Sequence, residues 1–218
     1  MKPTENLKDS QINNSNYYSL KSLLKRSYIK SKYLGILKDS ESIIKKSLLK
    51  NINNHNVIIT TGGASVGEED HLVNIVKKIG KIYFWKTAIK PGRPLAIGKI
   101  KNTIIVCLPG NPVSVHLLYG MIIRPFLEYL CTGILLMPKG ILTKTNFSMN
   151  KKNKRLEWLR VNIHKEKNNL VVEKYSKQGS GMISSIVYSD GIIEVPEHIK
   201  LIKRNDYFNF FSFKDLFI

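Results

Sequence analysis

One stretch, residues 57–70, constrains the fold more than any other part of the sequence. It reads VIITTGGASVGEED. The β-branched run Val57–Thr61 predicts a buried strand, and the two glycines behind it end that strand. A loop of small residues then leads to acids and, from His71, to a helical pattern. A strand, a glycine turn and a helix start present backbone N–H groups to an anion, because glycine lets a ligand approach the backbone closely.

The end of this loop carries the acids Glu68–Asp70, where a nucleotide P-loop has Lys followed by Ser or Thr. Carboxylates beside a phosphate site indicate a Mg²⁺ bridge or an acid that positions a nucleophile. Asp70 is therefore a candidate catalytic residue and a candidate Mg²⁺ ligand. The competing interpretation is an ordinary strand-to-helix turn in which Asp70 caps the following helix.

The charge of the chain is unusual. The formal net charge is +19, and lysine supplies nearly all of it, since only six of the 35 basic residues are arginines. Such a charge attracts nucleic acid or an anionic substrate. The lysines are scattered, however, and neither an RNP-like aromatic motif nor zinc-finger spacing is present. We therefore interpret most of the charge as a solvated surface and expect no nucleic-acid partner.

Further features predict a cytoplasmic protein with no membrane partner. The start of the chain is polar and lacks a signal-peptide pattern. The longest apolar helical stretch, about residues 113–130, is interrupted by Arg124, Pro125 and Glu128, which makes it too polar to span a bilayer. Cys107 and Cys131 lie in apolar runs and predict buried free thiols of a reducing compartment.

The chain alternates between short apolar runs and helical patterns up to about residue 131. The predicted strands are 32–37, 57–61, 82–88, 95–99 and 103–108, and the last two are predicted to form a hairpin around Lys101-Asn102. The predicted helices are 15–28, 40–53, 69–78 and 113–131. Strands separated by helices of this length predict a mostly parallel sheet covered on both faces. Ligands of such sheets bind beyond the carboxyl ends of the strands. Asp39, loop 62–70 and turn 109–112 each follow a predicted strand, so we expect them to gather at one edge.

After residue 138 the pattern of apolar residues changes. Residues 141–218 carry short alternating runs such as WLRVNI and YFNFFSF between polar turns. This pattern is typical of a small all-β barrel or sandwich. The sequence therefore predicts an α/β domain at residues 1–137 and a β-barrel-like domain at 138–218.

Three motifs occur in a fixed order along the chain: TTGGASVGEEDH, KTAIKPGRPLAIG and LPGNPVSV. In this order they resemble the molybdopterin molybdenumtransferases, the MoeA/gephyrin E-domain family. Weaker similarity in LEWLRV, Gly179-Ser180 and GIIEVP extends the resemblance to roughly residues 11–210. The resemblance implies a three-layer α/β/α, MoaB/MogA-like molybdopterin-binding domain followed by a small all-β C-terminal domain.

The resemblance also implies a reaction. Members of the family insert molybdate into adenylylated molybdopterin (molybdopterin-AMP) and release AMP. The cofactor that the resemblance implies is Mg²⁺. Carried over to this sequence, the catalytic acids are Asp39 and Asp70. The implied substrate-binding residues are Gly62, Gly63, Ser65, Gly67, Lys86, Lys90, Pro91, Arg93, Pro94, Asn111 and Ser114. Molybdate and a pyrophosphate link are anionic, so their binding needs backbone N–H groups and cations of this kind.

The sequence also departs from the family pattern. It lacks two N-terminal domains and the opening strand of the α/β domain with its Gly-Asp-Glu-like turn, so the sheet is expected to lack its first strand. We expect this chain alone to have little or no transferase activity. The expected partner is a second copy in a homodimer or a separate N-terminal fragment.

Two other functions compete with molybdenum insertion. A molybdopterin adenylyltransferase-like enzyme is disfavoured, because its loop usually continues GGTG where this chain has Gly62-Gly63-Ala64-Ser65. A non-catalytic binding or scaffold module has no need for Asp39 and Asp70 in one pocket. Convergence of these two acids therefore separates an enzyme from a scaffold.

Overall fold

The computed structural model describes residues 13–25, 29–62 and 71–217. The chain divides into two compact units, Met1–Ile36 and Leu37–Ile218.

The first unit contains one helix, α1 (Ser15–Leu23), in its described part. Asn14 caps this helix, since its side-chain oxygen accepts a hydrogen bond of 3.1 Å from the Tyr17 N–H. The Tyr17 and Tyr33 rings stack with centroids 3.8 Å apart. The predicted strand at 32–37 is wrong, because the segment is irregular. Gly35 has a φ of +99°, which breaks the extended conformation that a strand requires.

The second unit begins with α2 (Glu41–Asn51) and continues into a four-stranded sheet. Its strands are β1 (Val57–Thr61), β2 (Lys81–Trp85), β4 (Ala96–Ile100) and β5 (Thr103–Leu108), in the order β1-β5-β4-β2. β1 and β5 run parallel, whereas the β5–β4 and β4–β2 pairs are antiparallel. The expectation of a mostly parallel sheet is therefore wrong for these strands. The turn at Lys101-Asn102 is too short for a parallel crossover and forces an antiparallel hairpin.

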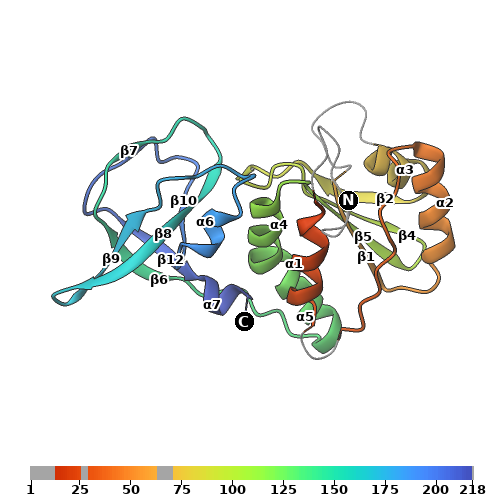
Figure 1. Ribbon diagram of the computed structural model, residues 1–218, viewed down its shortest axis with the longest axis horizontal. Helices are drawn as coiled ribbons and strands as arrows, with labels where there is room; N and C mark the ends of the chain where they lie inside the picture. The colour runs from red at the N-terminus through yellow and green to blue at the C-terminus, as the bar shows by residue number, and fades with distance from the viewer. Residues whose placement is uncertain (1–12, 26–28, 63–70, 218) are drawn as a thin grey trace. The chain divides into compact units, whose positions relative to one another are not determined.

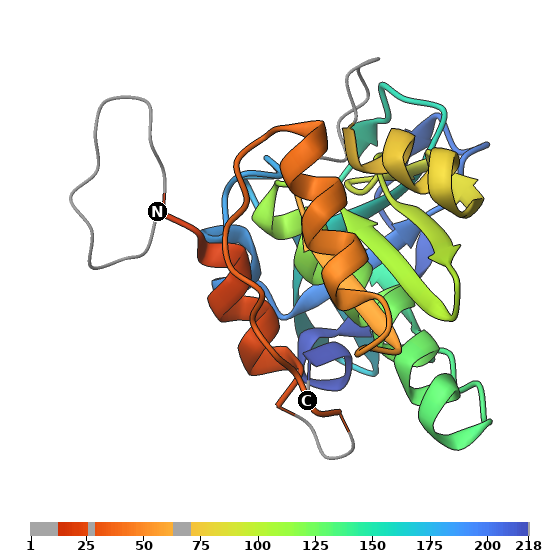
Figure 2. The ribbon, with the colours of Figure 1, turned by 90° about the vertical axis from the view of Figure 1, so that its right-hand side faces the viewer.

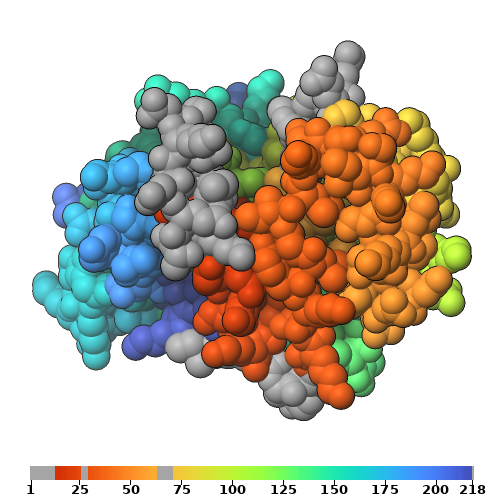
Figure 3. Space-filling model, turned by 45° about the vertical axis from the view of Figure 1, so that its right-hand side comes forward, coloured from red at the N-terminus to blue at the C-terminus, as the bar shows by residue number. Residues whose placement is uncertain are grey.

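Helices lie on both sides of this sheet, as the three-layer prediction requires (Figures 1 and 2). On one side are α2 and α3 (His71–Ile79), which pack against each other. On the other side α4 (Pro112–Leu118), a π-helical turn η1 (Tyr119–Ile123) and α5 (Arg124–Thr132) follow one another without a break. The buried residues of α2 are Ile44 and Leu48, so its remaining face is at the surface (orange in Figure 3).

The rest of the unit is a β-rich domain, as predicted. Its main strands are β6 (Ile141–Thr145), β8 (Leu156–Glu166), β9 (Asn169–Lys174), β10 (Gly191–Val195) and β12 (Tyr207–Ser212). They follow the order β10-β12-β6-β9-β8, and pairing of β10 with β8 closes them into a five-stranded barrel. The smaller elements are β3 (Ile89–Lys90), β7 (Met149–Asn150), β11 (Leu201–Ile202), α6 (Ser184–Val187) and α7 (Phe213–Phe217).

Alternate residues of the barrel strands point into one apolar core. Its buried members are Leu159, Val161, Val172, Ile193, Val195, Ile202, Phe208 and Phe210. The period of two that predicts these strands is thus the period of residues that fill the barrel. The fold class predicted from the sequence, an α/β domain followed by a small all-β domain, is confirmed.

Gly191 provides a test of the barrel closure. It lies where β10 meets both β8 and β12. A Cβ atom at this position would overlap the Phe211 carbonyl oxygen and lie 2.7 Å from the Phe210 ring. We expect Gly191→Ala to lower the free energy of unfolding by about 2–3 kcal/mol, a typical cost of overpacking. Urea denaturation measures this change.

Gly181→Ala is the matched control, because no atom lies within 4 Å of a Cβ built there. We expect this control to change stability by less than about 0.5 kcal/mol. Equal stability of the two variants would show that the strands do not approach each other as closely as described.

Two smaller predictions can be compared with the structure. Both cysteines are free; Cys107 is buried as expected, but Cys131 is exposed, because it lies on the solvent side near the end of α5. Within residues 13–25, 29–62 and 71–217, none of the helices has the length and apolarity needed to cross a bilayer.

Candidate functional site

Three loops meet at one edge of the four-stranded sheet. Gly62 follows β1, and its N–H donates to the Leu108 carbonyl at the end of β5 with 3.1 Å between N and O. A Cβ atom on Gly110 would lie 3.7 Å from the Gly62 Cα, so the turn after β5 contacts the start of the glycine loop. Trp85 at the end of β2 pairs with Ala96, which in turn pairs with Cys107 near the end of β5. The loop between β2 and β4 therefore begins at the same edge.

This β2–β4 loop, residues 86–95, is held by its own hydrogen bonds. The Lys86 N–H donates to the Leu95 carbonyl, and the Thr87 N–H donates to the Arg93 carbonyl. The Lys90–Pro91 peptide bond is cis. Gly92 has a φ of +140°, and a Cβ there would lie 3.0 Å from a Leu118 methyl group, so the loop packs closely on α4. The positive φ favours glycine at this position, and a Cβ atom there would also press on the Leu118 side chain.

The barrel joins the same loop through β3. The Leu156 N–H donates to the Ala88 carbonyl, and Ile89–Lys90 pairs with the start of β8. The Lys90 Nζ lies 2.7 Å from Glu157 Oε1. The Glu157 side chain is only 6% exposed, and its second oxygen accepts a 2.7 Å hydrogen bond from the Asn153 amide. A buried carboxylate of the barrel thus binds a lysine of the α/β part.

A second link joins the barrel to α4. The Val113 N–H in the first turn of α4 donates to the Ser180 carbonyl. The Gln178 side chain fixes this part of the barrel, because it accepts from the Arg160 N–H and donates to the Arg160 carbonyl. The segment 178–180 is thereby placed between Arg160 and the start of α4.

Arg160 is the residue that the sequence reasoning missed. It is 2% exposed, and its guanidinium makes two long hydrogen bonds, of 3.4 Å to the Trp158 carbonyl and 3.5 Å to the Gly179 carbonyl. Its Nε–H is buried without a partner among the described residues. Burial lowers the pKa of Arg160 to about 10, although Glu157 opposes the shift. A buried, incompletely bonded cation is the arrangement that an added anion stabilises.

Two sequence signals pointed to this residue. Arginine is rare in the chain, and Arg160 lies within the LEWLRV motif of the family resemblance. Its burial, however, depends on how β8 packs in the barrel, which the sequence does not show.

The predicted site residues fall into three groups. Those at or beside the junction of the loops, α4 and the barrel are Gly62, Lys86, Lys90, Pro91, Arg93, Pro94, Asn111 and Ser114. Asp39 is exposed and follows an irregular segment, not a strand. It lies directly before Ser40, the N-cap of α2. Gly63, Ser65, Gly67 and Asp70 lie outside the described residues. Convergence of Asp39 and Asp70 therefore stays a prediction.

The side chains at this junction carry mostly positive charge. Lys86 and Arg93 are exposed, and Arg160 is buried. The nearby carboxylate, Glu157, is already paired with Lys90. In the part of the chain that the structure describes, no group of three or more His, Cys, Asp or Glu side chains is arranged to hold a metal ion. These residues fit an anion, and the predicted Mg²⁺ ligand, Asp70, lies outside the described part.

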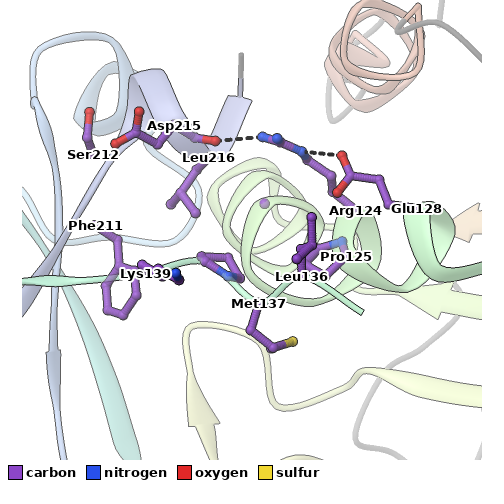
Figure 4. A pocket seen from close by; sticks show the side chains of 12 residues that line it. Arg124, Pro125, Glu128, Leu136, Met137, Lys139, Phe211, Ser212, Asp215 and Leu216 are labelled. Carbon is purple, nitrogen blue, oxygen red and sulfur yellow. Dashed lines mark hydrogen bonds and ion pairs between the residues drawn. The ribbon is translucent and has the colours of Figure 1, made fainter. Parts of the chain in front are cut away.

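A separate cavity of about 190 Å³ lies between α5 and the end of the barrel (Figure 4). Arg124 crosses its rim, with Nε donating to Glu128 and Nη1 donating to the Asp215 carbonyl. Leu136, Met137 and Leu216 line the cavity, and none of the predicted site residues does. The Arg124 guanidinium is thus already used in joining α5 to α7.

His116, beside the junction on α4, gives a pH-dependent test. Its Nδ1 lies 2.9 Å from the Pro112 carbonyl, so Nδ1 carries the proton. Burial lowers the pKa of His116 below its usual value of 6.5, with the Pro112 contact opposing this shift. The unfolded chain then binds the proton more readily than the folded chain. Stability is full above pH 6.5 and falls as the pH drops from there toward the folded-state pKa.

We expect His116→Gln to lose less stability than the wild type between pH 8 and pH 5. Urea midpoints at both pH values measure this, and the glutamine amide can still donate to Pro112. If both proteins showed the same pH dependence, His116 would not be the group whose protonation lowers stability.

Comparison with known proteins agrees with this architecture. The model of the probable molybdopterin binding domain matches residues 4–129, and the model of the MoeA C-terminal region (domain IV) matches residues 143–212. The fold therefore defines a molybdopterin-binding α/β domain followed by a β-barrel domain. The chain belongs to the MoeA family of molybdopterin biosynthesis proteins.

Individual relatives show the same relationship. The chain is 33% identical over 190 residues to the molybdopterin molybdenumtransferase of Haemophilus influenzae, covering 86% of this chain and 47% of that protein. It is 30% identical over 192 residues to a putative molybdopterin biosynthesis protein of Methanocaldococcus jannaschii, covering 88% of this chain and 45% of that protein. The chain thus spans about half the length of these curated relatives.

The fold is also shared with a solved structure. The crystal structure of the molybdopterin biosynthesis MoeA protein from Pyrococcus horikoshii superposes with a TM-score of 0.79 at 23% identity, covering 98% of this chain and 51% of that one. At this identity the likeness supports the fold alone.

Proposed function

We propose that this chain binds molybdate and adenylylated molybdopterin where the β2–β4 loop, the start of α4 and the barrel meet, and that it acts in molybdate insertion with release of AMP. The observation that carries this proposal is the meeting of motifs that lie far apart in the sequence. KTAIKPGRP contacts the barrel through Lys90 and Glu157, and LPGNPVS contacts it through Val113 and Ser180.

The chemistry of the two ligands fits these residues. Molybdate is a dianion, and the pyrophosphate link carries further negative charge. Lys86, Arg93 and Arg160 supply three cations, two of them exposed and one buried. Arg160 in particular has an N–H group without a partner in the part of the chain that the structure describes, and an oxyanion can accept from it.

Cleavage of the pyrophosphate link places new negative charge on the departing AMP. Fixed cations that already point to this position stabilise that charge without reorganising during the reaction. Asp70 and Asp39 are the proposed acids, and Asp70 would hold Mg²⁺. When bound there, Mg²⁺ would neutralise phosphate charge. Lys90 serves a different purpose in this proposal, because its pairing with Glu157 connects the loop to the barrel.

Two other functions, molybdopterin adenylyltransferase and a non-catalytic scaffold, fit these residues less well. The match of residues 143–212 to the MoeA C-terminal region favours molybdenum insertion over a molybdopterin adenylyltransferase. A scaffold module would have no use for a buried, underbonded arginine. As a partner we propose a second copy of the chain or a separate N-terminal fragment.

The proposed function is tested by incubating the purified chain with adenylylated molybdopterin, Mg²⁺ and molybdate. We expect little or no AMP release from the chain alone. After addition of the N-terminal half of a relative, we expect AMP release that depends on molybdate and saturates with its concentration. A chain that binds neither molybdate nor adenylylated molybdopterin would refute the proposal. Binding of both without AMP release, also after addition of the N-terminal half of a relative, would restrict the chain to a binding role.

A further inference from the structure

We propose that Trp85 is a positioning residue that holds the ammonium groups of Lys86 and Lys77 together as a two-cation clamp for a tetrahedral dianion. This inference rests on the proposed function, because Lys86 is one of the cations assigned there to molybdate. Neither Trp85 nor Lys77 is part of the glycine, proline or acidic motifs on which the proposed site depends.

The first observation is the placement of the two ammonium groups. The Lys86 Nζ lies 4.2 Å and the Lys77 Nζ 4.5 Å from the centroid of the Trp85 ring. The two nitrogens are therefore separated by no more than these two distances combined. Both distances are within the range of a cation–π interaction, and tryptophan has the most favourable ring for it. One side chain thus orders two cations that come from different elements, the β2–β4 loop and α3.

The second observation is the backbone of Lys86. Its φ is +69°, in the left-handed region that residues other than glycine rarely adopt. The Lys86 N–H donates to the Leu95 carbonyl, which holds the residue in this conformation. Backbone conformations of this kind persist where the surrounding structure imposes them, and they are concentrated at functional sites.

The third observation is the indole nitrogen. Trp85 Nε1 is buried, and it has no hydrogen-bond partner among the described residues. A buried donor without an acceptor is destabilising, so packing alone would favour phenylalanine at this position. The tryptophan is then better explained by its ring face, which binds cations more strongly than that of phenylalanine.

The electrostatics favour an anionic ligand. Elsewhere in this region a lysine is paired with an acid, as in Lys78–Glu41 at 2.6 Å. For Lys77 and Lys86, the described residues provide the Trp85 ring and no ion pair with a carboxylate. Two like charges held by one ring repel each other, and a bound dianion that contacts both offsets this repulsion. A tetrahedral oxyanion of charge −2, such as molybdate, is the class of ligand that this pair fits.

The test compares three variants by calorimetric titration with sodium molybdate. Trp85→Leu removes the ring, and Trp85→Phe keeps a weaker one. Tyr83→Leu is the matched control, because Tyr83 lies on the same strand and has its own lysine, with Lys81 Nζ 5.6 Å from the ring centroid. We expect Trp85→Leu to weaken molybdate binding by about two- to five-fold, which is the size of an exposed cation–π interaction. Trp85→Phe should lie between this variant and the wild type, and Tyr83→Leu should bind as the wild type does.

Proton NMR of the lysine ε-CH₂ groups provides a second measurement that does not depend on molybdate. The Trp85 ring current should shift the Lys86 and Lys77 signals upfield in the wild type, and Trp85→Leu should abolish the shift. Wild-type affinity for molybdate in Trp85→Leu, or lysine signals unaffected by this substitution, would overturn the inference. Ring-current shifts in a wild type that binds no molybdate would refute the proposed function and the clamp, while leaving the positioning by Trp85 established.

Discussion

Glu157→Ala is expected to lower the free energy of unfolding by about 2–3 kcal/mol, because it removes one partner of a buried charged group. The carboxylate is almost completely buried and binds both Lys90 and Asn153 at 2.7 Å. It also lies close enough to Arg160 to oppose the effect of burial on that residue's pKa. Lys90 is half-exposed and can be rehydrated after the substitution, whereas Arg160 would remain buried. Urea denaturation monitored by tryptophan fluorescence measures the loss.

Glu166→Ala is the matched control, since Glu166 is on the same strand but exposed. It pairs with His164 at 2.9 Å, and its side chain is 59% exposed. Exposed ion pairs contribute little, so we expect a change of less than about 0.5 kcal/mol. Glu157→Gln, which keeps the shape and loses the charge, should fall between the two. Equal effects of Glu157→Ala and Glu166→Ala would show that the Lys90–Glu157 pair does not connect the loop to the barrel.

Asp70→Asn is expected to reduce the rate of molybdate-dependent AMP release by about 100-fold or more, the usual size of the contribution from a positioned acid or base. The residue ends the glycine loop directly before α3 begins at His71. The amide keeps the size of the side chain but removes its charge and its capacity to exchange a proton. The initial rate at saturating molybdate, with the N-terminal half of a relative present, measures the effect.

Asp215→Asn is the control for this experiment, because it makes the same chemical change at an exposed position near the C-terminus. We expect its rate to stay within about two-fold of the wild type. If Mg²⁺ is held by Asp70, raising the Mg²⁺ concentration should partly restore the rate of Asp70→Asn and leave that of Asp215→Asn unchanged. Equal rates for Asp70→Asn and the wild type would remove Asp70 from the proposed mechanism.

Local patterns in the sequence predicted much of the fold. The β-branched run at Val57–Thr61 forms β1, and the alternating runs behind residue 141 form the barrel. In both cases the period of the apolar residues is the period of the side chains that become buried. The direction of the strands was predicted only in part. The hairpin around Lys101-Asn102 was predicted and is confirmed by the antiparallel pairing of β4 with β5. The antiparallel pairing of β2 with β4 was not predicted, because the period of apolar residues does not show strand direction.

The predicted strand at 32–37 shows a second limit. An apolar run becomes a strand only if another strand pairs with it, and pairing is a property of the whole fold. Gly35, which adopts a positive φ, is a local signal against the strand. The interpretation of Asp39 as an acid that follows a strand depended on that element and has to be replaced by a position before the N-cap of α2.

The candidate site shows the same division between local and long-range information. Its glycine loop, KPGRP segment and PGNP turn were recognised from their sequences, and the described parts of all three lie at one sheet edge. The contributions of Glu157 and Arg160 were not predicted, because both act through contacts between the barrel and the α/β part. Their roles follow from burial and from the partners of individual atoms, which become visible only in the folded chain.

The central claim is that molybdate binds where the β2–β4 loop meets the barrel. The most direct test is X-ray diffraction near the molybdenum absorption edge from crystals of the chain soaked in sodium molybdate. We expect an anomalous peak at this junction, within hydrogen-bonding distance of the Lys86 ammonium group. A peak bound only elsewhere on the chain, or none at saturating molybdate, would contradict the claim.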